Sequence, residues 1–184
     1  YFTKGLRVTE SRADGFSRDH VAMENSDISY ALGKGGSTRR KLATASNAIL
    51  QFIGSMAIIA GTLAERRRCR DYLQWLLTQR DGKVTIDTKD RSDVTELRLP
   101  DADCNWLVRG GGGSEARSIE QESGTFLLMA ENTQGKEVLL ICGHDPGAPH
   151  SKMGRAHAEQ LVEDAINGTG KSWRGGGGGG GGGG

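Results

Sequence analysis

Two glycine-rich loops are the segments of this chain whose residue types could do chemistry. The first is Gly33-Lys34-Gly35-Gly36, and the second, about 77 positions later, is Gly110-Gly111-Gly112-Gly113. Glycines at both ends of such a loop let the backbone approach a ligand closely, because no Cβ stands in the way. Each loop also precedes a predicted helix, whose free N–H groups and positive dipole end attract phosphate. We therefore expect the loops to bind the backbone of a nucleic acid.

The elements that must position these loops repeat in the same order. In the first copy we expect a strand at 21–23, a helix after the loop at 37–46, and two strands at 48–53 and 56–60. In the second copy the corresponding elements are a strand at 97–99, a helix at 114–122, and two strands at 125–129 and 138–142. The strands are rich in β-branched and large apolar residues. An amphipathic helix closes each copy, and in the first copy it begins with a capping box formed by Thr62 and Glu65. The pattern predicts a β-α-α-β-β-α unit that occurs twice.

This arrangement resembles the K homology (KH) family in its eukaryotic-type form. The first copy, Leu32-Gly33-Lys34-Gly35-Gly36-Ser37-Thr38, fits the G-x-x-G loop of that family closely. The second, Val108-Arg109-Gly110-Gly111-Gly112-Gly113-Ser114, fits it less tightly. The resemblance covers roughly residues 19–168. It implies an α+β fold of two tandem KH modules, each a three-stranded sheet with three helices on one face.

The resemblance also divides the chain. Residues 1–18 are expected to be an N-terminal segment that ends a preceding repeat, because residues 5–9 resemble residues 82–85. The remaining parts are a first module (19–81), a linker (82–93), a second module (94–168) and a glycine-rich flexible tail (169–184).

The family's mode of binding implies which residues contact a ligand. In that mode the loop and its flanking helices hold about four single-stranded nucleotides against an apolar groove. The residues carried over are Ile28, Leu32, Gly33, Lys34, Gly35, Gly36, Ser37, Arg39, Arg40, Ile49 and Leu50 in the first module, and Arg109, Gly110, Gly111, Gly112, Gly113 and Arg117 in the second. Whether the aliphatic members line the groove or the core behind it stays open. Arg39 and Ala116 stand where the family usually has an aliphatic residue that faces the bases.

Charge is distributed unevenly between the two copies. Residues 19–80 hold nine Lys and Arg against five Asp and Glu, whereas residues 93–168 hold six against thirteen. The second loop has no lysine, and Glu115 lies beside it. Because affinity for nucleic acid comes largely from cations near phosphates, we expect the first module to bind more strongly than the second.

The predicted function is non-catalytic binding of single-stranded RNA, or less favourably of single-stranded DNA. No residue spacing indicates a catalytic triad, a metal site or a cofactor. A nucleotide-binding P-loop is disfavoured because Ile28 stands where that motif needs its first glycine. The alternative is a protein-interaction scaffold that uses the acidic second module and an Arg-rich helix, whose arginines are expected to be solvated (Arg66, Arg67, Arg68 and Arg70).

Cysteine usage and hydropathy bear on the compartment. Cys69, Cys104 and Cys142 are odd in number and widely spaced, which favours free thiols over a disulfide framework. No apolar run reaches the length of a membrane span. We therefore expect an intracellular protein of the cytoplasm or nucleus that meets RNA, and protein partners through the second module, without contact with a membrane.

Overall fold

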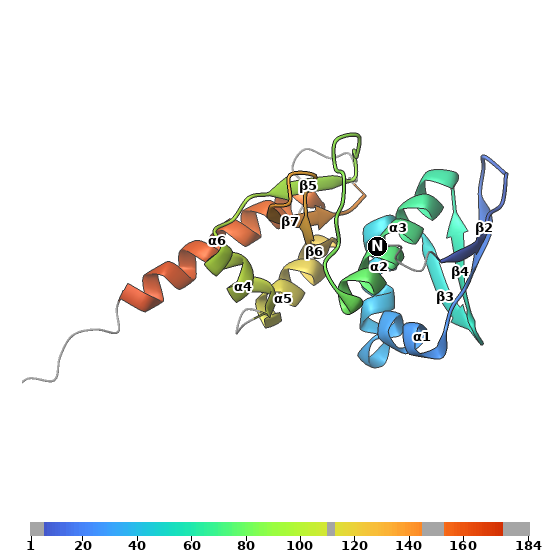
Figure 1. Ribbon diagram of the computed structural model, residues 1–184, viewed down its shortest axis with the longest axis horizontal. Coiled ribbons are helices and arrows are strands. Elements are labelled where there is room, and N and C mark those ends of the chain that lie inside the picture. The colour runs from blue at the N-terminus through green and yellow to red at the C-terminus, as the bar shows by residue number, and fades with distance from the viewer. Residues whose placement is uncertain (1–5, 110–112, 145–152, 175–184) are drawn as a thin grey trace, which may run out of the picture.

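The computed structural model describes residues 6–109, 113–144 and 153–174. Within these ranges it is a mixed α/β structure of two sheets and six α-helices (Figure 1). Its elements are β1 (Arg7–Thr9), β2 (Ser17–Ala22), α1 (Asn25–Leu32), the 3₁₀ turn η1 (Lys34–Gly36), α2 (Ser37–Ser46), β3 (Ile49–Ile53), β4 (Met56–Gly61), α3 (Leu63–Asp81), β5 (Val94–Leu97), α4 (Asp101–Arg109), α5 (Gly113–Ser123), β6 (Phe126–Glu131), β7 (Glu137–Cys142) and α6 (Arg155–Arg174).

The order β-α-α-β-β-α occurs twice along the chain, as predicted. We call the run from β2 to α3 the first copy and the run from β5 to α6 the second copy. Helix α2 has the predicted bounds, and the capping box of α3 is confirmed: the Thr62 N–H donates to Glu65 Oε2 over 2.8 Å, and the Glu65 N–H donates to Thr62 Oγ1 over 3.4 Å. The two bonds satisfy N–H groups that the start of a helix leaves unpaired.

The first sheet has four strands, so the expectation of three was wrong for this copy. Its order is β1-β2-β4-β3, and all neighbours are antiparallel. The added strand β1 pairs with β2 in the register Arg7↔Ala22 to Thr9↔His20. Part of the N-terminal segment therefore belongs to the first sheet. The second sheet has the expected three strands, in the order β5-β7-β6.

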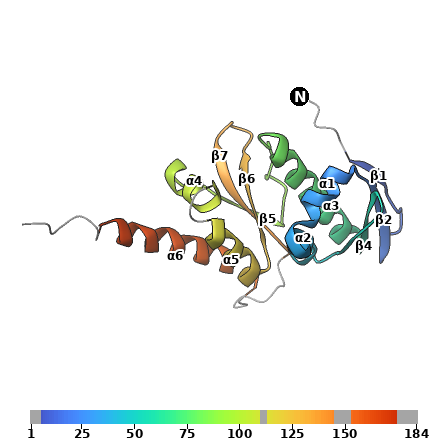
Figure 2. The same cartoon turned by 90° about the horizontal axis from the view of Figure 1, so that it is seen from below.

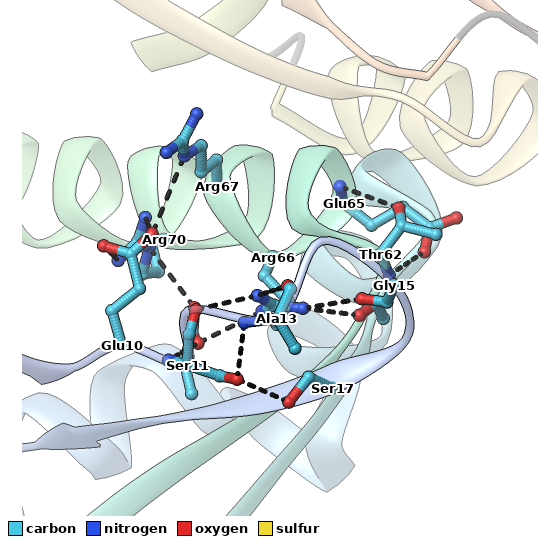
Figure 3. A network of polar contacts seen from close by, with 12 residues as sticks. Glu10, Ser11, Ala13, Gly15, Ser17, Thr62, Glu65, Arg66, Arg67 and Arg70 are labelled. Carbon is cyan, nitrogen blue, oxygen red and sulfur yellow. Dashed lines mark hydrogen bonds and ion pairs between the residues drawn. The ribbon is translucent and has the colours of Figure 1, made fainter.

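Arg66 of α3 is buried, which contradicts the expectation that the Arg-rich helix is solvated. Its side chain has no exposed surface, and its Nε–H donates to Asp19 Oδ1 over 3.1 Å. The four remaining guanidinium bonds go to the backbone carbonyls of Ser11, Ala13, Gly15 and Gly61 (Figure 3). The rigid fork of donors thus fixes the turn between β1 and β2, which explains how the extra strand is held.

The second sheet is buried on both faces because the first copy packs against it. Side chains alternate along a strand, so adjacent residues face opposite sides. Leu127, Met129, Leu139 and Ile141 pack with residues of α4, α5 and α6. The alternate positions join the core of the first copy: Phe126, Leu128, Ala130, Val138, Leu140 and Cys142. Figures 1 and 2 show the resulting layers, with α2 and α3 between the two sheets.

Residues 82–93, expected to be a linker, are packed between the copies. Val84 and Ile86 are buried, and the backbone of residues 84–86 bonds to Glu131 at the end of β6. The Arg91 guanidinium bonds to Asp71 of α3 and to Asp93, and it lies 4.8 Å from the centre of the Trp75 ring. At the other boundary α6 continues to Arg174, beyond residue 168 where the second module was expected to end.

Candidate nucleic-acid interface

The first glycine loop (residues 33–36) is an exposed backbone segment between two helices. Gly33, Gly35 and Gly36 have φ of 69°, 60° and 76°, in the region that only glycine adopts without strain. A Cβ on Gly33 would lie 2.3 Å from Thr38 Oγ1, whereas a Cβ on Gly35 would meet nothing within 4 Å. Lys34 and Gly35 are exposed. Gly33 is therefore required for the turn, and Gly35 opens to solvent, where a ligand has access.

The loop ends at the N-terminus of α2. Gly36 is the N-cap of this helix and has no side chain that could cap the first turn. The Arg40 guanidinium reaches back and donates to the Gly35 carbonyl over 2.7 Å. Ser37, Lys34 and Arg40 are all exposed here. The loop therefore combines a helix N-terminus with two cations, which is an arrangement that favours an anionic ligand.

Arg39 lies on a different side of α2 from Arg40. Its Nη1–H donates to the carbonyl of Leu50 over 3.0 Å. Leu50 belongs to β3, which is an edge strand of the first sheet. Arg39, which the sequence predicted to lie in the groove, thus extends from α2 to the edge of the sheet. Its half-buried guanidinium supplies the hydrogen bond that the Leu50 carbonyl needs.

The four aliphatic residues carried over from the family are not all near the loop. Leu32 is 38% exposed at the end of α1, next to Gly36. Ile28 is half-buried against the core. Leu50 is fully buried in that core, and Ile49, its neighbour on β3, is 54% exposed on the opposite face of the sheet. Of these four residues, the structure therefore places Leu32 beside the loop.

The second glycine loop lies mostly outside the described residues. Gly110, Gly111 and Gly112 are among those not described, Gly113 is the first residue of α5, and α4 ends at Arg109, whose side chain is not described. Arg117 is exposed on α5 and faces a groove that α2 of the first copy also lines. The loop therefore connects two helices as expected, while its cation Arg117 lies at the boundary between the copies.

The sequence pattern does not indicate one contact that the structure shows between the two copies. Lys41 of α2, which lies near the first loop in sequence, donates from Nζ to Glu120 Oε2 on α5 over 3.0 Å. Glu120 is 7% exposed, and its Oε1 accepts the backbone N–H of Leu127 on β6 over 2.9 Å. Burial raises the pKa of Glu120, although the charge of Lys41 opposes that rise. Nothing in the spacing of Lys41 and Glu120 indicates this pair, because it depends on how the copies pack.

The strand edges next to α2 and α5 differ in charge. Leu50 and Leu127 are equivalent positions, since Asn47 and Gly124, the left-handed residues after α2 and α5, stand three positions before them. The cationic side chain of Arg39 donates to the backbone carbonyl of Leu50. The carboxylate of Glu120 instead accepts a hydrogen bond from the backbone N–H of Leu127. The edge of the first copy is therefore the one suited to a phosphate backbone.

Of the other three arginines in this cluster of α3, Arg68 and Arg70 are held by contacts, and Arg67 is largely exposed. Arg68 donates to the Ser46 carbonyl over 3.1 Å, and Arg70 pairs with Glu10 over 3.1 Å. Arg67 is 61% exposed and lies 3.7 Å from the same glutamate. The contacts of Arg66 and Arg70, which Figure 3 shows, hold α3 to the segment between β1 and β2. Arg68 holds α3 to the end of α2.

Chains similar to this one are found among solved structures. No family model and no curated protein matches the chain. Among solved structures, a chain of the a/eIF2alpha-aDim2p-rRNA complex from Pyrococcus horikoshii OT3 aligns over 83% of this chain and 95% of its own length, with 15% identity and a TM-score of 0.32. A TM-score this low does not establish a shared fold. No helix in the described ranges is both long and apolar enough to cross a bilayer.

Proposed function

We propose that this chain binds single-stranded RNA, without catalysis, and that the first glycine loop is its principal site. The observation that carries the proposal is the loop itself. It is a bare, exposed backbone segment that leads into a helix N-terminus, with Lys34 exposed and Arg40 bonded to the loop carbonyl. An anionic strand fits such a surface better than a neutral ligand does, because helix dipole and side-chain charges have the same sign.

The two copies are proposed to be KH-type modules of unequal strength. The repeated order of elements supports this assignment, and so does the position of each glycine loop between two helices. The first copy offers Arg39 at its strand edge, whereas the second offers Glu120. The scaffold alternative has less support, because Arg66, Arg68 and Arg70 of α3 are engaged in contacts within the chain.

Gly35→Asp tests the proposal directly. The new side chain would stand in open space above the loop, where the phosphate is proposed to lie. Its charge should weaken binding of a random-sequence RNA of about ten nucleotides by roughly 10- to 100-fold, the worth of a lost hydrogen bond to a charged group. Fluorescence anisotropy at about 50 and 200 mM salt measures the affinity and its salt dependence. The same titration with DNA of equal length shows which of the two strands is preferred.

Gly135→Asp is the matched control. Gly135, in the turn between β6 and β7, has φ of 70° and likewise no atom within 4 Å of an added Cβ. The two variants therefore share the charge change and a similar backbone strain of about 1–2 kcal/mol. Equal RNA affinity of the two variants, or no RNA binding by the unaltered chain, would refute the proposed function.

A further inference from the structure

A groove of about 400 Å³ lies between the two helices that follow the glycine loops. Its walls include Ser37, Arg40 and Lys41 from α2 and Arg117, Glu120 and Gln121 from α5. Arg39, which contacts the β3 edge, is not among its lining residues, whereas Ser37 and Arg40 belong both to the groove and to the surface of the first loop. The groove exists only because the copies are packed together.

The charges that line this groove favour an anion. Three of the side chains are cations, and the single carboxylate, Glu120, is already neutralised by Lys41 at 3.0 Å. Arg40 and Arg117 are both exposed, which leaves two positive charges facing solvent. Ser37 adds a hydroxyl at the first turn of α2, where the positive end of the helix dipole lies. The partly buried ion pair of Lys41 with Glu120 therefore supports the wall, and the exposed cations Arg40 and Arg117 remain for a ligand.

Arg40 joins the groove to the first glycine loop. Its guanidinium bonds to the Gly35 carbonyl, while the residue also lines the groove. A strand that lies on the loop would meet Arg40 at the point where the groove begins. Arg117 then stands across the groove on the second copy.

We propose that this groove binds the phosphates of the same single strand that the first loop holds, so that Arg117 of the second copy extends the site of the first. The inference rests on the proposed function and adds a path for the strand. It also gives the second copy a role that does not depend on its own glycine loop. The occupant is a phosphodiester backbone, because the free groups in the groove are cations, hydroxyls and an amide, all of which suit phosphate oxygens.

The experiment compares RNA of about four nucleotides, which the loop alone accommodates, with RNA of about ten nucleotides, which reaches the groove. In the full chain, Arg117→Glu should lower the ratio of long to short RNA affinity by about tenfold. It should also reduce, by about one unit, the slope of log affinity against log salt concentration for the long RNA. The control is Arg98→Glu, which makes the same charge change at a 67% exposed arginine of the second copy that does not line this groove. That variant should keep the ratio of the unaltered chain.

The outcomes separate the two proposals. If Arg117→Glu and Arg98→Glu change the ratio equally, or neither changes it, the groove does not hold the strand, and the inference fails while the effect of Gly35→Asp can still stand. If Gly35→Asp matches its Gly135→Asp control, the proposed function fails and this inference falls with it. A loss confined to Arg117→Glu, with a thermal melt like that of the unaltered chain, supports the groove.

Discussion

The outer faces of the two sheets have equivalent strand positions and opposite environments. Ile49, Gln51 and Ile53 of the first sheet correspond to Phe126, Leu128 and Ala130 of the second, counted from the left-handed residue after α2 and α5. The first three are exposed, and the second three are buried against α2 and α3. The same β-α-α-β-β-α order therefore yields one sheet with an open face and one with none. The difference comes from stacking one copy on the other.

The helices that close the two copies differ in a related way. Helix α3 buries a charged side chain, Arg66, paired with Asp19 of the first sheet. Helix α6 buries the small apolar residues Ala158 and Val162 in the described part of the chain. The first copy thus depends on a buried charged network for its extra strand. At α6 the buried side chains are apolar, and the polar contacts come from less buried residues such as Arg155, which donates to Thr95 and to the Ser92 carbonyl.

The largest expected effect is on that polar network. Arg66→Ala leaves the carboxylate of Asp19 buried without its main partner. It removes five hydrogen bonds in all, three of which hold the turn before β2. The free energy of unfolding should fall by about 3–5 kcal/mol. Urea denaturation of the purified chain measures it. Arg67→Ala, at the exposed neighbour, should leave the midpoint unchanged; similar losses in both variants would contradict the assignment of Arg66 as the anchor.

A somewhat smaller effect is expected at the buried outer face of the second sheet. Leu128→Ala removes a side chain with no exposed surface and should destabilise the chain by about 2–5 kcal/mol. Gln51→Ala changes the equivalent, exposed position of the first sheet and should alter stability by less than about 0.5 kcal/mol. Thermal unfolding followed by circular dichroism compares the two. Equal losses would mean that the outer face of the first sheet is covered as well.

The smallest effect concerns the ion pair between the copies and depends on pH. The pKa of Glu120 is raised above its usual 4.5 by burial, so the folded state favours the neutral acid more than the unfolded state does. The stability that protonation brings is therefore full below pH 4.5 and is lost as pH rises through the higher pKa of the folded state. Glu120→Gln should be at least as stable as the unaltered chain at neutral pH, and its advantage should shrink as pH falls toward and below 4.5.

Unfolding curves across that pH range measure the effect. A Glu120→Gln variant that is less stable at neutral pH, and equal at acid pH, would show that the attraction of Lys41 outweighs the cost of burial. The same variant also tests whether the charge of Glu120 matters for the groove, because Glu120 of α5 is one of the residues that line it.

Local sequence patterns predicted the order of the elements in both copies and the bounds of some of them. The strands expected at 21–23 and 97–99 lie instead at Ser17–Ala22 and Val94–Leu97, and β1 was not expected. The bounds of α2, the capping box at Thr62 and Glu65, and the position of the first loop between two helices follow from residues close together in the chain. Glycine conformations, helix caps and strand propensities act over a few residues, so a linear pattern contains them. The exposure of Lys34 and Gly35 likewise agrees with the sequence.

Contacts between residues far apart in the chain could not be predicted from the sequence. The burial of Arg66 depends on carbonyls of residues 11, 13, 15 and 61 that meet only after β1 and β2 pair. The packing of residues 82–93 and the pair of Lys41 with Glu120 depend on the two copies being stacked. The amino-acid sequence by itself determined the repeated order of helices and strands and the place of the glycine loops within it. The tertiary structure alone decided which charges are buried, paired or left for a ligand, because those outcomes depend on distances between residues far apart in the chain.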